Sequence, residues 1–177
     1  KVHCLVLKDL DTEEVYSFEP EEIRTGVEML MGADLIVGHN VINFDIPALA
    51  KVYPWFSVSE DSVLDTLVIS RLIYTDIKDK DWNNIRKGKN LPPKLAGSHS
   101  LESWGYRLGD YKGDYDGGWE FWSQEMQDYC VQDVEVTFKL HHFLRGKNYS
   151  AQAIELEHQV AWIVAQQMRD GFYFDER

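Results

Sequence analysis

The sequence contains few cysteines and no long apolar run. Only two of its 177 residues are cysteines, Cys4 and Cys130, and no Cys-x-x-Cys pair occurs. This excludes a disulfide framework and suits a reducing compartment. The longest apolar runs, such as 35–37 and 67–69, are far too short to span a bilayer, and no charged-then-apolar signal peptide opens the chain. We therefore expect a soluble, intracellular protein with no membrane partner.

Positive charge is also scarce. Eighteen Lys and Arg residues stand against 30 Asp and Glu, which gives a formal net charge of −12. Such a balance argues against a protein that binds duplex DNA mainly by neutralising phosphates. Nucleic-acid chemistry remains open, because divalent cations held by carboxylates can supply the missing positive charge.

Several catalytic signatures are missing from the sequence. It has no Gly-x-Ser-x-Gly elbow, no Walker loop, no Gly-x-Gly-x-x-Gly and no His-Glu-x-x-His. The six histidines do not cluster at zinc spacing, and the adjacent His141 and His142 are expected on different faces of a helix, in contact with solvent. We therefore discount a zinc site.

The residues that are present predict one α/β domain with a sizeable core. Hydrophobic residues make up 44% of the chain and aromatic residues 13%. Apolar periodicity and turn residues predict strands at 2–7, 15–18 and 35–37, helices that begin at Pro20, Pro47 and Asp65, and helices over 98–105, 124–144 and 154–168. In the last helix, we expect four apolar residues to face inward: Leu156, Val160, Ile163 and Val164.

Two segments are predicted to be irregular. The charged stretch 76–94 is expected to be a long surface loop, in which solvation is the favoured role of the cations and DNA contact the minor one. Aromatic residues crowd the connection 106–122. They could stack on unpaired bases, but covering a core edge is the favoured role for most of them.

The helix predicted over 124–144 places a phenol and a carboxylate on one face. Tyr129 and Asp133 are four residues apart, and a second stripe at the same spacing is expected to be buried, namely Met126, Cys130, Val134 and Phe138. A carboxylate at the margin of a packed face needs a partner, a metal ion or water.

Asp45 is the second candidate carboxylate. It lies where the strand 35–37 gives way to a helix, and binding groups in α/β folds collect at the carboxyl ends of strands. A role as a simple helix cap is an equal alternative for Asp45 and the favoured role for Asp65. Asp45 and Asp133 could hold Mg²⁺ while Tyr129 orients an attacking water, but a two-metal site needs further acidic ligands, for which the chain shows no obvious candidates.

Two motifs in this order carry a family resemblance. The block from Gly38 to Asp45 (GHNVINFD) and the block from Tyr129 to Asp133 (YCVQD), together with 64–67, 97–109 and 157–172, resemble the 3′-to-5′ proofreading exonuclease domain of family A DNA polymerases, in the branch of podovirus-type phages. The resemblance implies a ribonuclease H-like mixed β-sheet flanked by helices. In this chain, the N-terminal strand of that sheet is expected to be missing.

The resemblance also implies a site and its ligands. Asp45 and Asp133 would bind two Mg²⁺ ions, or Mn²⁺ in their place, and Tyr129 would orient the nucleophilic water. Asn40 and Phe44 would contact the terminal nucleotide of a single-stranded 3′ end in primer-template DNA, in the cytoplasm of an infected bacterial cell. The family's first motif, Asp-x-Glu, would precede Lys1, so we expect little exonuclease activity from this fragment.

The resemblance further implies a division of the chain. Residues 1–149 would form the exonuclease domain without its first motif, and 150–177 would start the connection to a covalently attached polymerase domain. The stretch 109–122 looks shortened relative to the phage proteins. Two other interpretations remain: a stand-alone DNA- or RNA-trimming exonuclease, which the closing Asp170-Gly171-Phe172 disfavours, and a silent scaffold, which the intact Asp45, Tyr129 and Asp133 disfavour.

Overall fold

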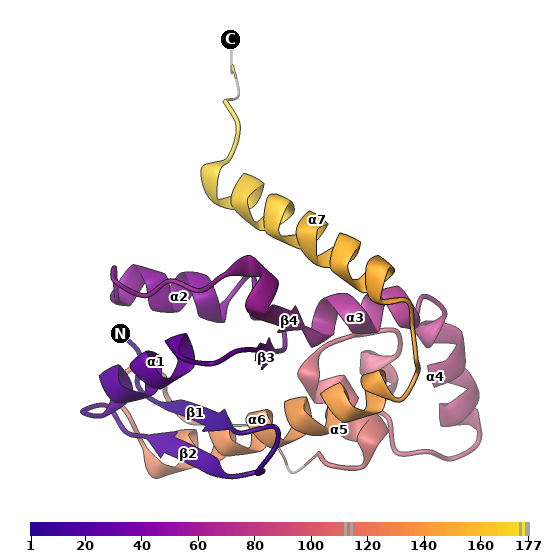
Figure 1. Ribbon diagram of the computed structural model, residues 1–177. Helices are drawn as coiled ribbons and strands as arrows, with labels where there is room; N and C mark the ends of the chain where they lie inside the picture. Colours follow the sequence, from indigo (N-terminus) through magenta and orange to yellow (C-terminus); the bar gives the residue numbers. More distant parts are fainter. Residues whose placement is uncertain (112, 114, 174, 176–177) are drawn as a thin grey trace.

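A computed structural model of the chain describes residues 1–111, 113, 115–173 and 175, and its elements are shown in Figure 1. The strands are β1 (Leu5–Lys8), β2 (Val15–Phe18), β3 (Ile36–Gly38) and β4 (Val63–Asp65). The helices are α1 (Ile23–Met31), α2 (Asp45–Val52), α3 (Thr66–Ile73), α4 (Ile77–Arg86), α5 (Leu101–Leu108), α6 (Gln124–Arg145) and α7 (Ala151–Asp170). The predicted α/β class is confirmed.

The described strands form two separate pairs. β1 and β2, which correspond to the strands predicted at 2–7 and 15–18, form an antiparallel hairpin in which Leu5 lies opposite Phe18. β3 and β4 are parallel, with Ile36 opposite Val63. No strand among the described residues joins the two pairs into one sheet. The long helix α6 packs against β1, and α3 packs against both α6 and α7.

Helix ends follow the local sequence closely. The Oγ atom of Ser123 accepts a hydrogen bond from the Met126 backbone N–H at the start of α6, and Ser100 and Ser150 do the same for α5 and α7. α5 ends at Gly109, whose φ of +74° favours glycine. The predicted cap of α3 at Asp65 is also confirmed, although α1 begins at Ile23 rather than Pro20, and α2 at Asp45 rather than Pro47.

The prediction of a surface loop over 76–94 is wrong, because α4 fills half of it. This helix is strongly charged, with few apolar residues to reveal its period, but Asp81 on its inner face is buried. The Asp81 Oδ2 atom accepts a hydrogen bond from Arg107 Nη2 at 2.7 Å, and the side chain of Arg107 is only 11% exposed. A buried ion pair to a distant helix therefore fixes α4, and local sequence does not show such a contact.

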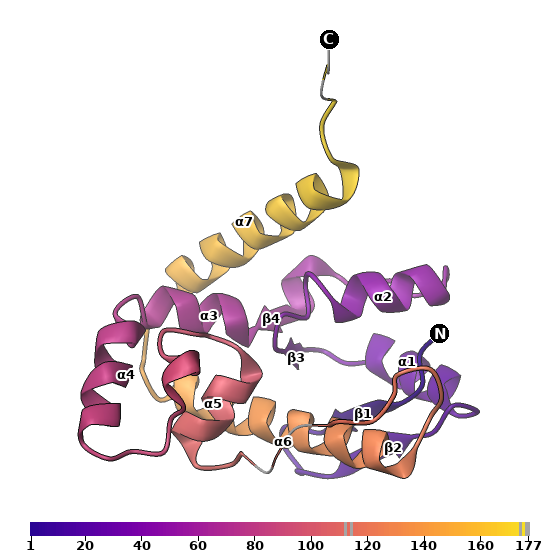
Figure 2. The same ribbon diagram turned by 180° about the vertical axis from the view of Figure 1, so that it is seen from behind.

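The inward face predicted for the last helix is also wrong. Four of its apolar side chains are exposed: Leu156 by 59%, Val160 by 45%, Ile163 by 66% and Val164 by 42%. The buried residues of α7 are instead His158 and Ala165. Apolar residues occupy both sides of α7, so the apolar pattern alone does not decide which side is buried. The side that packs against the domain carries His158, whose Nε2 atom accepts a hydrogen bond from the Asp65 backbone N–H at 2.7 Å. Figures 1 and 2 show α7 extending away from the other elements beyond this anchor.

The orientation of α7 can be tested by two matched substitutions. Ile163→Gln on the exposed side should change the free energy of unfolding by less than about 0.5 kcal/mol. Ala165→Gln, at a position that is 2% exposed, should lower it by about 1 to 3 kcal/mol, because the larger side chain overpacks the core. Urea denaturation measures both values. The reverse order of the two effects would show that α7 packs through its other side.

No helix in the described part of the chain combines the length and the apolar character that a membrane crossing requires.

Candidate active site

The turn between β3 and α2 is held by one buried carboxylate. Asp65 is 1% exposed, and its Oδ1 atom accepts hydrogen bonds from the backbone N–H groups of Asn40 at 2.8 Å and Leu67 at 2.9 Å. Its Oδ2 atom accepts a third from the Ile42 N–H at 3.2 Å. Asp65 therefore caps α3, as predicted, and also fixes the turn in which Asn40 takes a φ of +61°.

His39 adds a second restraint to the same turn. Its Nε2–H donates to the His99 backbone oxygen at 2.9 Å, and its Nδ1 lies 2.9 Å from Thr66 Oγ1. Burial lowers the pKa of His39, so the neutral ring predominates. The turn that carries the Gly38–Asp45 block is thus fixed from both sides, which gives Asp45 a defined position.

Asp45 is the first residue of α2, whose N-cap is Phe44. The side chain of Asp45 reaches solvent on one side, but the surrounding protein displaces water from the carboxyl group and raises its pKa to about 6, and the negative charge of Asp65 adds to this effect. The alternative that Asp45 is simply the N-cap is therefore wrong, because Asp45 follows the cap position.

Asp133 lies on α6 and is electrostatically coupled to Asp45. Partial burial and, to a smaller extent, the negative charge of Asp45 together raise the pKa of the Asp133 carboxyl to about 6. Both carboxylates line one cavity of about 2380 Å³, which we call the central cavity, and β1, β3 and α6 all contribute to its walls. The structure thus brings together two acids that are 88 positions apart in the sequence.

Asn40 and Phe44 also line the central cavity. Phe44 is 68% exposed, which is unusual for a large apolar side chain beside a buried turn. An exposed aromatic ring next to a carboxylate offers a stacking surface for a nucleobase. Three of the residues predicted in the Gly38–Asp45 block, namely Asn40, Phe44 and Asp45, therefore line the same cavity.

Tyr129 faces a different hollow. It lines a pocket of about 1100 Å³ formed mainly by residues 115–125, and its ring centroid lies 6.0 Å from that of Tyr115 and 6.4 Å from that of Trp119. Trp119 is 62% exposed and Phe121 is 79% exposed, so these two do not cover a core edge as we expected. The shortening predicted over 109–122 includes residues 112 and 114, which lie outside the described residues.

Two further expectations about α6 need correction. Of the stripe predicted to be buried, only Met126 is fully so, while Cys130, Val134 and Phe138 are half-buried at the central cavity. His141 was expected in solvent but is 3% exposed, because α6 is covered on more sides than a simple amphipathic helix.

Sequence reasoning also missed a nearly buried cation in the lining of the central cavity. Lys8 on β1 has a side chain that is only 9% exposed, and its Nζ atom donates to both carboxylate oxygens of Glu135, at 2.8 and 2.9 Å. This ion pair neutralises Glu135, two residues beyond Asp133 on α6. A lysine on a short strand carries no local signal of such a partner.

Asp45 and Asp133 fit a shared divalent cation. Two carboxylates that repel each other and have raised pKa values are stabilised by a positive ion between them. Among the described residues, however, no group of three or more His, Cys, Asp or Glu side chains is placed to hold a metal ion. The described residues therefore supply only part of such a site, and further ligands are needed for two ions.

The raised pKa of Asp133 predicts a pH-dependent stability. Because the folded state binds this proton more tightly than the unfolded chain, stability should fall as the pH rises from about 4 to about 6. Asp133→Asn removes the buried charge and should raise the free energy of unfolding by about 1 to 2 kcal/mol at pH 7, a value discounted for partial exposure, with little change near pH 4. Urea denaturation without divalent cations at both pH values measures this. Equal effects at the two pH values would contradict it.

No protein-family profile matches the chain. Two curated proteins are similar to it over its entire length: the DNA-directed DNA polymerase of Escherichia phage T7, at 37% identity, and that of Enterobacteria phage T3, at 36%. The resemblance to a phage DNA polymerase is confirmed. The chain spans only 31% of either relative. The aligned region covers 222 positions, more than this chain has residues, so the phage polymerases contain additional residues within it.

Proposed function

We propose that this chain is the 3′-to-5′ exonuclease part of a phage DNA polymerase, and that this part, once completed by the Asp-x-Glu motif, hydrolyses the terminal phosphodiester bond at a single-stranded DNA 3′ end. The observation that carries this proposal is that Asp45 and Asp133 line the same central cavity, where the charge of Asp45 contributes to the raised pKa of Asp133. Its support is the similarity of the whole chain to phage DNA polymerases.

Each site residue has a role in this proposal. Asp45 and Asp133 hold Mg²⁺, for which Mn²⁺ can substitute, and the bound ions supply the positive charge and the acidified water that hydrolysis requires. Phe44 stacks on the terminal base, and Asn40 contacts the same nucleotide. Tyr129 stands one helical turn before Asp133 and lines the 115–125 pocket, so its proposed role of orienting the attacking water requires its side chain to turn from that pocket toward Asp133.

The separation of the two strand pairs supports a ribonuclease H-like sheet with one strand still to be added. β1 and β3 each have one described partner, β2 and β4 respectively, and both line the central cavity. A strand inserted between them would pair with both free edges and join the two pairs into one mixed sheet. We propose that residues upstream of Lys1 supply this strand, together with the Asp-x-Glu ligands that the site lacks.

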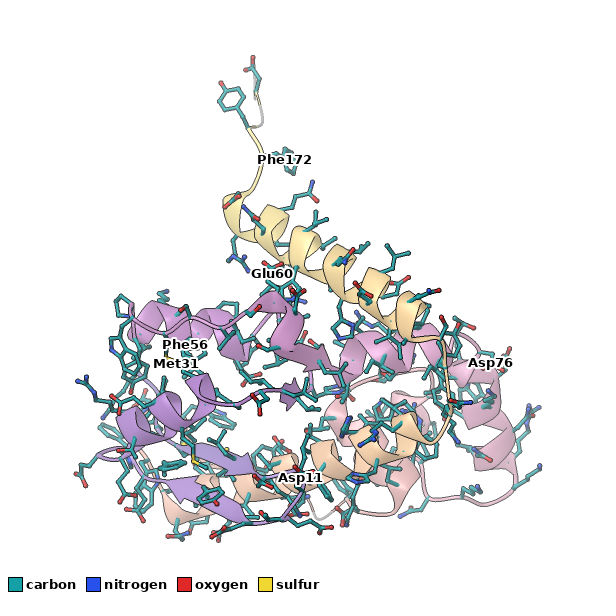
Figure 3. The ribbon with its side chains drawn as sticks, in the orientation of Figure 1. Asp11, Met31, Phe56, Glu60, Asp76 and Phe172 are labelled. Carbon is teal, nitrogen blue, oxygen red and sulfur yellow. The ribbon has the colours of Figure 1, made fainter. Side chains whose placement is uncertain are left out.

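The exposed side of α7 supports the proposed connection to a polymerase domain. Leu156, Val160, Val164 and Met168 recur every four residues along this helix, all four are exposed, and Met168 is the most exposed at 73%. Figure 3 shows Phe172 beyond the end of α7, away from the remaining elements, and its side chain is 85% exposed. A contiguous apolar stripe of this kind marks an interface. We propose that the remaining part of the same polymerase chain covers it.

The proposed function is tested by comparing substrates. A chain extended upstream to include the missing strand should release nucleotides from 3′-labelled single-stranded DNA in Mg²⁺, and should release fewer from blunt duplex DNA, whose end must first fray. Single-stranded RNA of the same sequence is the matched control. Faster RNA hydrolysis would favour an RNA-trimming enzyme, and no hydrolysis of any substrate would favour a silent scaffold.

A further inference from the structure

The two cysteines of the chain are 126 positions apart but lie together in the structure. Cys4 immediately precedes β1 and Cys130 lies on α6, two elements that pack against each other. The thiols form a hydrogen bond to each other, and neither is in a disulfide. Both are half-buried and both line the central cavity. Neither thiol has a role in the proposed hydrolysis.

We propose that Cys4 and Cys130 form a redox-modification site, which reacts with a small disulfide such as oxidised glutathione to give an intramolecular disulfide. The proposal concerns the thiols alone and holds whether or not the chain is an exonuclease. It requires a thiol that attacks, a second thiol within reach to resolve the adduct, and access from solvent. The contact of the two thiols at the wall of an open cavity provides all three.

The two thiols differ in a way that sets the order of reaction. The hydrogen bond from the Cys130 S–H lowers the pKa of Cys4, because it stabilises the Cys4 thiolate. The same contact, together with burial, raises the pKa of Cys130. Cys4 is therefore the thiol that attacks an external disulfide, since the thiolate is the nucleophile, and Cys130 is the thiol that resolves the adduct.

The reaction is balanced over two exchange steps. The Cys4 thiolate attacks one sulfur of oxidised glutathione, so that a Cys4–glutathione disulfide forms and one glutathione thiolate leaves. The Cys130 sulfur then attacks Cys4 Sγ, gives up its proton, and displaces the second glutathione. In total, two protein thiols are oxidised to one disulfide, and one oxidised glutathione is reduced to two molecules of glutathione.

The new bond would restrain the wall of the central cavity. Cys130 stands three residues before Asp133 on α6, so both side chains occupy neighbouring turns of one helix face. A disulfide requires the sulfur atoms to approach to about 2.05 Å, closer than two hydrogen-bonded thiols. Oxidation would therefore tie the start of β1 to the turn of α6 that precedes Asp133, and would close a long loop in the unfolded chain.

The test uses the 177-residue chain, oxidised glutathione and intact-mass spectrometry. The native chain should lose both free thiols and the mass of two hydrogens, without a lasting glutathione adduct, and dithiothreitol should restore it. Digestion without reduction should yield one linked pair of peptides that contains Cys4 and Cys130. The oxidised chain should also unfold at a higher temperature than the reduced chain.

Two single variants test the order of attack. Cys130→Ser should accumulate one stable glutathione adduct at Cys4, because the resolving thiol is gone. Cys4→Ser should react more slowly, because Cys130 remains a protonated thiol. Stable adducts on both cysteines of the native chain, a disulfide between two chains, or the retention of both thiols would each overturn the proposal. The peptide map of the native chain decides this even if a variant fails to fold.

Discussion

Asp133→Asn should lower Mg²⁺-dependent nucleotide release by about a thousandfold in the chain extended upstream. The substitution keeps the size of the side chain but removes the negative charge that, with Asp45, faces the central cavity. Loss of one metal-binding carboxylate removes several kcal/mol of transition-state stabilisation, and each 1.36 kcal/mol corresponds to a factor of ten in rate. The measurement is the initial rate of release from 3′-labelled single-stranded DNA.

Asp128→Asn is the matched control for this prediction. Asp128 lies on the same helix but is exposed, and it pairs with Gln124 Nε2 at 2.9 Å on the surface of α6. Asp128→Asn should leave the rate of nucleotide release within about twofold of that of the unaltered protein, which corresponds to a small change in activation free energy. If Asp133→Asn retains the rate of the unaltered protein, Asp133 is not a metal ligand, and the assignment of the site is wrong.

Asp65→Ala should lower the free energy of unfolding by about 3 kcal/mol or more. The substitution leaves three backbone N–H groups without their acceptor, those of Asn40, Ile42 and Leu67, and an unsatisfied buried donor costs about 1 to 3 kcal/mol. It also removes the cap of α3, worth about 1 kcal/mol. Water entering the turn would offset part of this sum. Urea denaturation at neutral pH measures the change.

The control here is an exposed acid four residues earlier. Asp61 belongs to the short 3₁₀ turn Glu60–Ser62 before β4, and Asp61→Ala should change stability by less than about 0.5 kcal/mol. The free energy of unfolding of Asp65→Asn should lie between those of Asp65→Ala and Asp61→Ala. The amide oxygen of Asn can still accept hydrogen bonds, but its N–H groups add donors that have no acceptor in this turn. A stability of Asp65→Ala equal to that of Asp61→Ala would show that Asp65 does not hold the turn.

Local rules predicted the elements that local chemistry determines. The cap at Asp65, the strands β1 and β2 and the long helix α6 all rest on contacts within a few residues, and the structure has each of them. The junction that carries Asp45 could be located for the same reason. The strand that ends at Gly38 and the helix that begins at Asp45 are close together in the sequence.

The errors arose where a distant partner decides the outcome. α4 is held by the buried pair of Asp81 and Arg107, and α7 is turned by the hydrogen bond between His158 and the Asp65 backbone. In both cases, the apolar pattern of the helix itself is weak or two-sided. Within the candidate site, the sequence located Asp45 and Asp133 but not the buried network of Asp65, which only the folded turn reveals.

The central claim is that the central cavity holds a 3′-to-5′ exonuclease site, and product sizes test it most directly. The chain extended upstream should be incubated with a single-stranded DNA labelled at its 5′ end, with Mg²⁺ and, separately, with a chelator. We predict a ladder of 5′-labelled products that shorten by one nucleotide at a time in Mg²⁺ only, and no ladder from Asp45→Asn. Internal cuts, immediate release of the 5′ label, or a full-length strand that persists in Mg²⁺ would contradict the account.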